Sequence, residues 1–169
     1  KTLDYIRKGI FTIADAKRGD IGNTSSLYAK AFFEQMNFDS ITVAPYMGED
    51  SVKPFLKFKD KWVILLGHTS NPGSADFQLI ESKVTGRKLY EEVILTAQKW
   101  ATPEQLMFVI GATQSDKIQH LREIAKEYFF LVPGIGAQGG DLEEVSKFGM
   151  NKKCGLIVNA TRSVIYASP

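Results

Sequence analysis

Short apolar runs alternate with stretches of helical periodicity along this chain of 169 residues. Six of the runs are typical of strands buried on both faces, because each is short and almost continuously apolar. They lie at residues 10–14, 40–44, 62–66, 106–110, 129–132 and 155–159. Strand–helix alternation of this kind predicts a parallel sheet with right-handed crossover connections.

Two helices are indicated by apolar side chains that recur on one helical face. The predicted faces comprise Leu89, Val93, Ala97 and Trp100 in one helix, and Ile118, Leu121, Ala125 and Tyr128 in the other. A further helix is expected from about Thr24 onward. Asp141, followed three residues later by Glu144, predicts an N-cap with its reciprocal partner.

The number of strands bears on the fold class. An open sheet can use six strands, whereas a (β/α)8 barrel needs eight and roughly 250 residues. Segments 133–140 and 160–163 follow the fifth and sixth runs, and the loops after strands 7 and 8 of such barrels commonly bind phosphate. We therefore predict an α/β fold, a (β/α)8 TIM barrel seen as strands 3 to 8. Residues 1–169 form one incomplete barrel domain, without strands 1 and 2 and the last helix.

Composition excludes some functional classes. The chain is 44% hydrophobic and 24% charged, which is ordinary for a globular protein. No apolar stretch approaches the roughly 18 residues of a membrane span, and the start of the sequence lacks the apolar region of a signal peptide. A net charge of +2 is too small to indicate nucleic-acid binding. The single cysteine, Cys154, fits a reducing compartment, so a cytoplasmic location is expected.

The densest cluster of charge is Asp15, Lys17 and Asp20, at the end of the first apolar run. The period of two along a strand places Asp15 and Lys17 on the same side. The carboxyl ends of parallel strands are where α/β proteins carry out chemistry. A structural ion-pair network is the alternative, but charge networks are costly to maintain, and the pattern therefore favours catalysis.

The glycines of segment 133–140 leave backbone N–H groups free to bind phosphate, and a helix that begins near Asp141 adds its dipole. Arg162 is a candidate second ligand because its guanidinium matches phosphate oxygens. A plain glycine turn and a surface arginine are the alternatives. Segment 69–74 is polar, and by itself it indicates only a turn. His68 and His120 lack metal-ligand spacing and are interpreted as structural, so no metal site is predicted.

Four segments together carry a family resemblance. They resemble, in this order, the motifs of orotidine 5'-monophosphate decarboxylases: residues 15–24 (DAKRGDIGNT), 69–73 (TSNPG), 133–140 (PGIGAQGG) and 159–163 (NATRS). The last three segments are most similar to the longer bacterial branch of this family. The resemblance implies a homodimeric (β/α)8 barrel that needs no metal or organic cofactor. The implied reaction is decarboxylation of orotidine 5'-phosphate to uridine 5'-phosphate, the last step of de novo UMP synthesis.

The resemblance also implies roles for individual residues. Lys17 donates a proton to C6 of the pyrimidine, and Asp15 lies near the substrate carboxylate and holds Lys17. Asp20 and Thr24 reach the neighbouring subunit's site, Thr24 toward the ribose. The other implied substrate-binding residues are Ser70 and Gln138 at the pyrimidine, and Pro133, Gln138, Gly139, Gly140 and Arg162 around the phosphate.

Chemistry is consistent with these roles, since a fixed ammonium stabilises the carbanion left by CO₂ and then protonates it. The family's ribose-binding aspartate on strand 1 and its lysine on strand 2 are not in this sequence. Leu3, Tyr5 and Ile6 are expected to end the helix after strand 2. Three alternatives stay open: a magnesium-dependent sugar-phosphate decarboxylase or synthase of the same suprafamily, a Schiff-base aldolase, and a non-catalytic nucleotide-binding module.

Overall fold

The computed structural model describes residues 3–111, 115–135 and 141–168. The chain divides into two compact units, Lys1–Val63 and Ile64–Pro169, and each is described by itself. The six strands follow one another in chain order, β1 to β6. In the described part of the chain, no helix is both long enough and apolar enough to cross a membrane.

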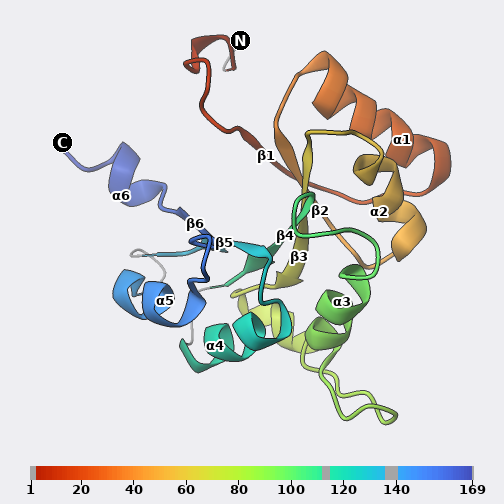
Figure 1. Ribbon diagram of the computed structural model, residues 1–169, viewed down its shortest axis with the longest axis vertical. Coiled ribbons are helices and arrows are strands. Elements are labelled where there is room, and N and C mark those ends of the chain that lie inside the picture. Colours follow the sequence, from red (N-terminus) through yellow and green to blue (C-terminus); the bar gives the residue numbers. More distant parts are fainter. Residues whose placement is uncertain (1–2, 112–114, 136–140, 169) are drawn as a thin grey trace. The chain divides into compact units, whose positions relative to one another are not determined.

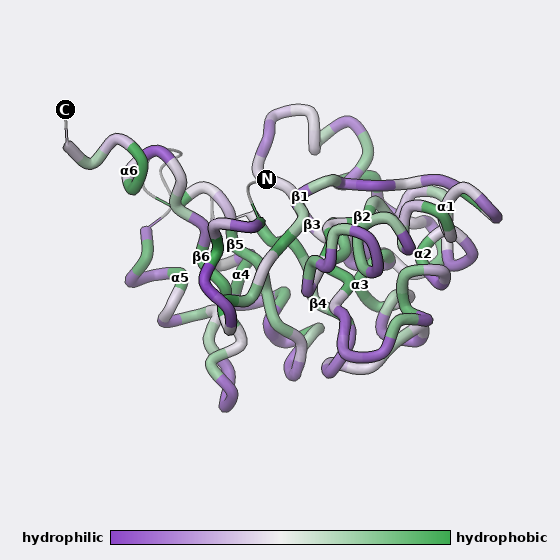
Figure 2. The backbone as a smooth tube through the Cα atoms, turned by 90° about the horizontal axis from the view of Figure 1, so that it is seen from above, coloured by the Kyte–Doolittle hydropathy of each residue, from purple (hydrophilic) through white to green (hydrophobic). Residues whose placement is uncertain are grey.

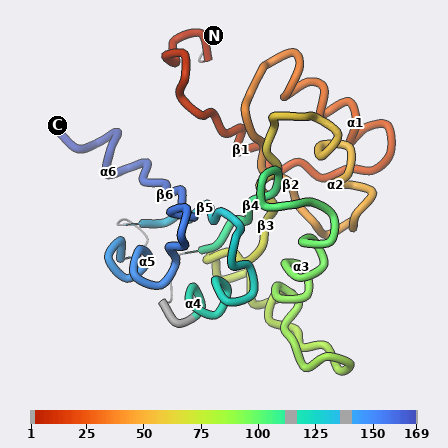
Figure 3. Tube along the Cα trace, viewed as in Figure 1, coloured from red at the N-terminus to blue at the C-terminus, as the bar shows by residue number. Residues whose placement is uncertain are grey.

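The first unit contains two parallel strands with helices after each of them. Its elements are the 3-10 helix η1 (Leu3–Tyr5), β1 (Ile13–Arg18), α1 (Gly22–Lys30), the π-helix η2 (Ala31–Gln35), β2 (Ser40–Val43) and α2 (Glu49–Leu56). Helices α1 and α2 lie side by side (Figure 3). Phe33, Val52 and Phe55 are buried side chains of η2 and α2.

The second unit continues the alternation of strands and helices. Its elements are β3 (Trp62–His68), which starts in the first unit, η3 (Pro72–Asp76), α3 (Leu89–Ala97), β4 (Leu106–Ile110), α4 (Ser115–Ile124), β5 (Phe129–Pro133), α5 (Leu142–Gly149), β6 (Leu156–Asn159) and α6 (Arg162–Ile165). Strand β5 pairs in parallel with both β4 and β6. Helices α4 and α5 lie side by side (Figure 1). The predicted alternation of parallel strands and helices is confirmed.

The predicted strand bounds agree closely with the structure except at the first strand. Strand β1 begins at Ile13 rather than at residue 10 and continues to Arg18. Ile10 and Phe11 are exposed, and the parallel register starts only where Ile13 faces Ser40. Apolar character alone therefore misplaced the strand. Asp15 and Lys17 lie inside β1, not in the loop after it.

The helix predictions are confirmed in part. In α3 the buried side chains are Tyr90, Ile94 and Ala97, so the predicted face was wrong at Leu89, which is exposed. The helix also ends at Ala97, before Trp100. In α4 the expected Ile118 and Leu121 are buried, and so are Ala125 and Tyr128 just beyond its end. The Asp141 carboxylate caps α5 by accepting the N–H groups of Glu143 and Glu144 at 2.7 and 3.3 Å.

Arg122, on the buried face of α4, joins four segments of the second unit. Its side chain is nearly buried, and its guanidinium lies 3.8 Å from the centre of the Phe130 ring. It donates to the carbonyl oxygens of Gly149 (2.7 Å), Ala125 (2.9 Å), Lys126 (3.3 Å), Tyr128 (2.7 Å) and Gly155 (3.0 Å). Burial lowers the pKa of Arg122 to about 10, against the opposing effect of Glu127. The guanidinium therefore stays charged at neutral pH, and its charge is stabilised largely by the carbonyl dipoles.

The short helix α6 buries none of its side chains, whereas α1, α2, α3 and α5 each bury some of theirs. Val164, Ile165 and Tyr166 are all exposed. Part of the tube beside the α6 label has the colour of hydrophobic residues (Figure 2). This short helix is positioned by its attachment to β6 and by turn hydrogen bonds from Val164 and Ile165 to the Thr161 carbonyl.

Replacing Arg122 with methionine is expected to destabilise the protein by at least about 2 kcal/mol, because several buried carbonyl groups lose their donor. The measurement is urea unfolding of the whole protein, read as a lower midpoint at unchanged slope. Arg87→Met is the matched control. Arg87 is half-exposed and pairs with Glu92 at 3.8 Å, so its loss should cost less than about 0.5 kcal/mol. Equal effects of the two substitutions would contradict a structural role for Arg122.

Candidate functional site

An ammonium and a carboxylate are held together on β1 of the first unit. Lys17 Nζ lies 2.6 Å from Asp15 Oδ1, and the two side chains are 54% and 59% exposed. The alternating burial along β1 places both on its accessible face, as the period of two predicted. The pair therefore presents a fixed positive charge, with its counter-charge, where a substrate can reach it.

The backbone at Lys17 is unusual. Its φ angle is +45°, in the left-handed region that residues with a side chain rarely adopt. The register between β1 and β2 shifts between Ala14 and Arg18, as at a β-bulge. Regular hydrogen bonding resumes where Ala44 N–H donates to the Arg18 carbonyl at 2.8 Å. The register shift and the left-handed conformation thus coincide at the position that carries the ammonium.

Thr42, in the middle of β2, forms hydrogen bonds with both residues of this pair. Its side-chain oxygen accepts the Lys17 N–H at 2.9 Å and donates to Asp15 Oδ1 at 3.0 Å. Thr42 is fully buried, so one hydroxyl fixes both the strained backbone and the carboxylate. Sequence reasoning missed this residue; the available signal was a polar side chain inside the otherwise apolar run 40–44.

Asp20 and Thr24, the other predicted site residues of the first unit, lie on the loop and the helix that follow β1. Asp20 Oδ1 accepts the N–H of Ile21 at 2.8 Å, just before the start of α1. Thr24 is exposed on the first turn of α1. In the described part of the first unit, the acidic partner that the structure gives Lys17 is Asp15. Asp20 and Thr24 remain accessible candidates for contacts with another molecule.

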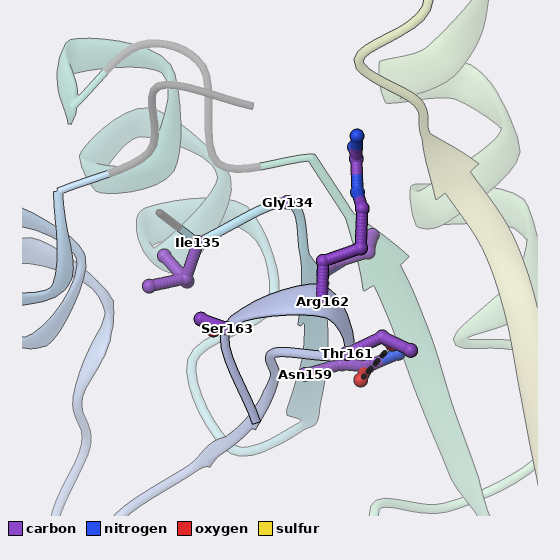
Figure 4. Close-up of a pocket in the computed structure, with 7 residues that line it drawn as sticks. Gly134, Ile135, Asn159, Thr161, Arg162 and Ser163 are labelled. Carbon is purple, nitrogen blue, oxygen red and sulfur yellow. Dashed lines mark hydrogen bonds between the residues drawn. The ribbon is translucent and has the colours of Figure 1, made fainter. Parts of the chain in front are cut away.

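The second unit contains a small pocket where β5 and β6 end. Its volume is about 130 Å³, and it is lined by Pro133, Gly134, Ile135, Asn159, Thr161, Arg162 and Ser163 (Figure 4). Thr161 Oγ1 donates to Asn159 Oδ1 at 3.3 Å. The Arg162 guanidinium and the Ser163 hydroxyl in this lining are donors suited to phosphate oxygens. Pro133 and Arg162 are thus brought together, whereas Gln138, Gly139 and Gly140 lie outside the described residues.

Ser70 follows the end of β3 in the same unit and is half-buried. Two residues before it, the His68 ring is buried and lies edge-on to Tyr90, with ring centres 4.6 Å apart. Within the described residues, His68 Nδ1 has no hydrogen-bond partner. Burial lowers the pKa of His68 to about 4, with Lys117 and Lys88 adding to the effect. This histidine is therefore neutral at physiological pH, consistent with a structural residue.

Comparison with known proteins identifies the relatives of this chain. The model of the orotidine 5'-phosphate decarboxylase / HUMPS family matches residues 1–169. The chain belongs to this family. Its members include orotidine 5'-phosphate decarboxylases of Bacteroides fragilis, 59% identical over 98% of the chain, and of Flavobacterium johnsoniae, 57% identical over 99%. The chain spans 61% and 62% of those two proteins, about three fifths of their length.

Solved structures of the family agree with the fold. The OMP decarboxylase of Leishmania donovani is 37% identical and superposes with a TM-score of 0.88, over 95% of this chain and 63% of that one. A Methanocaldococcus jannaschii decarboxylase complexed with the inhibitor BMP gives a TM-score of 0.73 at 29% identity, over 92% of this chain and 66% of that one. The predicted fold class is confirmed: the chain is part of a (β/α)8 barrel.

Among the residues that the structure describes, no group of three or more His, Cys, Asp or Glu side chains is arranged to hold a metal ion. At the Asp15 carboxylate, the place of a cation is taken by the Lys17 ammonium. This arrangement suits a site in which the lysine itself supplies the positive charge.

The depressed pKa of His68 predicts a pH dependence of stability. Because the pKa falls from 6.5 to about 4 on folding, the stability associated with neutral His68 is fully present above pH 6.5. It is lost as the pH falls toward 4, where the unfolded chain binds a proton that the folded chain does not. Relative to His68→Phe, the wild type should lose up to about 3 kcal/mol over this range. Urea unfolding at several pH values measures the difference, and parallel pH curves would contradict the prediction.

Proposed function

We propose that the whole protein decarboxylates orotidine 5'-phosphate to uridine 5'-phosphate, the last step of de novo UMP synthesis. The observation that carries the proposal is the Asp15–Lys17 pair, 2.6 Å apart on an accessible strand face. It lies in a chain 59% identical to a protein named orotidine 5'-phosphate decarboxylase. This chain spans 61% of that relative's length.

The chemical step requires a positive charge beside C6 of the pyrimidine. When the bond between C6 and the carboxylate breaks, CO₂ leaves and the electron pair stays on C6. The Lys17 ammonium stabilises this pair and then transfers a proton from Nζ to C6. Asp15 holds the ammonium in place through their ion pair, and Thr42 holds Asp15. Because this array is set before the substrate binds, little reorganisation is needed during the reaction.

The strained backbone at Lys17 supports the same proposal. Residues held at positive φ cost on the order of 1–3 kcal/mol and are concentrated at functional sites. Here the cost is met by a specific contact, the Lys17 N–H to the Thr42 hydroxyl at 2.9 Å. A lysine required only for solubility has no need of such support.

Binding of the phosphate is assigned to the pocket at the ends of β5 and β6. Arg162 supplies charge, and Thr161 and Ser163 supply hydroxyls. By the family pattern Pro133, Gly139 and Gly140 complete this environment, Gln138 bridges phosphate and pyrimidine, and Ser70 contacts the pyrimidine. The phosphate is remote from the bond that breaks, so its binding energy can serve to orient the ring.

The proposal extends to assembly and location. We infer a homodimer in which Asp20 and Thr24 reach the neighbouring subunit's site, since both are accessible on the loop and helix that follow β1. The reaction as written needs no metal or organic cofactor, because Lys17 supplies both the charge and the proton. A cytoplasmic location, with no nucleic-acid or membrane partner, completes the proposal.

A magnesium-dependent sugar-phosphate enzyme is the principal alternative, since the name of the matching family covers more than one activity. The ion pair favours the decarboxylase, because an ammonium bound to Asp15 competes with a metal ion for the same carboxylate. A non-catalytic module that binds uridine 5'-phosphate is the second alternative. The next experiment separates both from the proposed function.

The whole protein is expected to consume orotidine 5'-phosphate in the presence of a chelator, followed by loss of substrate absorbance. Lys17→Ala should lower kcat by at least about a thousandfold, since a group that stabilises charge in the transition state is removed. Lys53→Ala is the matched control, because Lys53 is also an exposed lysine paired with a carboxylate, Glu49, at 3.0 Å. Turnover that is lost with chelator indicates the magnesium enzyme, and binding without turnover indicates the module.

A mixture of two inactive variants tests the shared site. Asp20→Ala and Lys17→Ala proteins should regain some activity on mixing, because a hybrid dimer contains one site with both native residues. Each variant mixed with itself is the control, and subunit exchange is verified by mass spectrometry of labelled protein. No recovery after verified exchange would contradict a site completed by Asp20 of the neighbour.

A further inference from the structure

The turn that carries Ser70 is fastened by a side chain from outside it. Gln78 Oε1 accepts the N–H of Thr69 at 2.9 Å, and Gln78 Nε2 donates to Thr69 Oγ1 at 2.8 Å. Thr69 Oγ1 in turn donates to Asn71 Oδ1 at 2.7 Å. The residues on both sides of Ser70 are therefore tied into one hydrogen-bonded chain that starts at a single amide group.

Gln78 is itself anchored, which makes it an effective support. Its backbone N–H donates to the Ser74 carbonyl at 2.9 Å, and its carbonyl accepts the N–H of Tyr90 at 3.2 Å. The first bond ties it to η3 and the second to the start of α3. Its side chain is half-buried, so its two bonds to Thr69 are partly protected from competition by water.

A second constraint acts on Ser70 from the adjoining strand. Gly111 follows β4, and its N–H donates to the His68 carbonyl at 2.8 Å. A Cβ atom at Gly111 would lie 2.7 Å from both the backbone nitrogen and the Cβ of Ser70. Ser70 thus lies directly against bare backbone. The absent side chain of Gly111 sets how close Ser70 can approach β4, while Gln78 sets the orientation of the turn.

We propose that Gln78 is a positioning residue for Ser70, acting through Thr69 against the backbone of Gly111. The inference rests on the proposed function, in which Ser70 contacts the pyrimidine of the substrate. A hydrogen bond to a base discriminates only if its donor or acceptor is held at a fixed place, and here Gln78 supplies that fixation. Its role is therefore in recognition of the base, not of the phosphate.

A double-mutant cycle of Gln78→Ala and Ser70→Ala tests the proposal. In the whole protein, Gln78→Ala should lower kcat/KM for orotidine 5'-phosphate by between about tenfold and a hundredfold, the range expected for a misplaced contact. In the Ser70→Ala background the same substitution should have almost no further effect, because the group that it positions is already absent. Additive losses in the two backgrounds would overturn the proposal.

Two further measurements separate positioning from general damage. Ribose 5-phosphate, which lacks the base, should inhibit wild type and Gln78→Ala with equal inhibition constants. If Gln78→Ala weakened ribose 5-phosphate binding by the same factor as it lowered kcat/KM, the assignment to the base would be overturned. Gln98→Ala is the matched control, since Gln98 is a half-buried glutamine that donates to the Ile124 carbonyl at 3.2 Å, away from the turn. Its kcat/KM should remain near that of the wild type. Gln78→Glu, which keeps an acceptor for the Thr69 N–H, should retain more activity than Gln78→Ala.

Failure of the proposed function is distinguishable from failure of this inference. If wild-type protein does not consume orotidine 5'-phosphate, the decarboxylase proposal fails. Amide hydrogen exchange then reads the positioning directly. Gln78→Ala should accelerate exchange of a peptide that covers residues 68–72 and leave β5 unchanged. Unchanged exchange in that peptide would overturn the role of Gln78.

Discussion

The second unit depends on one buried cation. Arg122 donates to carbonyl groups in the segments before β5 and β6 and to the last residue of α5, while its guanidinium lies over Phe130. A guanidinium can do this because its five N–H groups fan out in one plane and it keeps its charge when buried. These carbonyls lie where a regular element begins or ends, and the Gly155 carbonyl also accepts the N–H of Phe130 at 2.9 Å. One side chain thus supplies donors to carbonyl groups of several segments at once.

The Arg122 guanidinium and the pocket lie at opposite ends of β5 and β6. Arg122 binds the carbonyls of Tyr128 and Gly155, which immediately precede β5 and β6 respectively. Pro133 and Asn159, which line the pocket, are the last residues of the same strands. Parallel strands carry function at their carboxyl ends. The opposite ends can therefore be cross-linked tightly without restricting the residues that line the pocket.

Pattern reasoning recovered what depends on apolar periodicity and on local motifs. The strands and the Asp141 cap are local features, and Asp15 and Lys17 share a face because a strand repeats every two residues. The start of β1 was missed because exposed Ile10 and Phe11 look like strand residues until a partner strand is known. Thr42, Gln78 and Arg122 were missed for a related reason. Their importance comes from hydrogen bonds to residues distant in the sequence or in neighbouring segments, and no local spacing encodes those partners.

The left-handed backbone of Lys17 places two demands on one position. Glycine adopts a φ of +45° without steric cost, so by conformational preference alone it is the better residue there. Glycine, however, has no side chain with which to form the ion pair with Asp15. Selection of variants for thermal tolerance alone would therefore tend to replace this lysine, and the best-folded protein from such a selection would lack the Asp15–Lys17 ion pair.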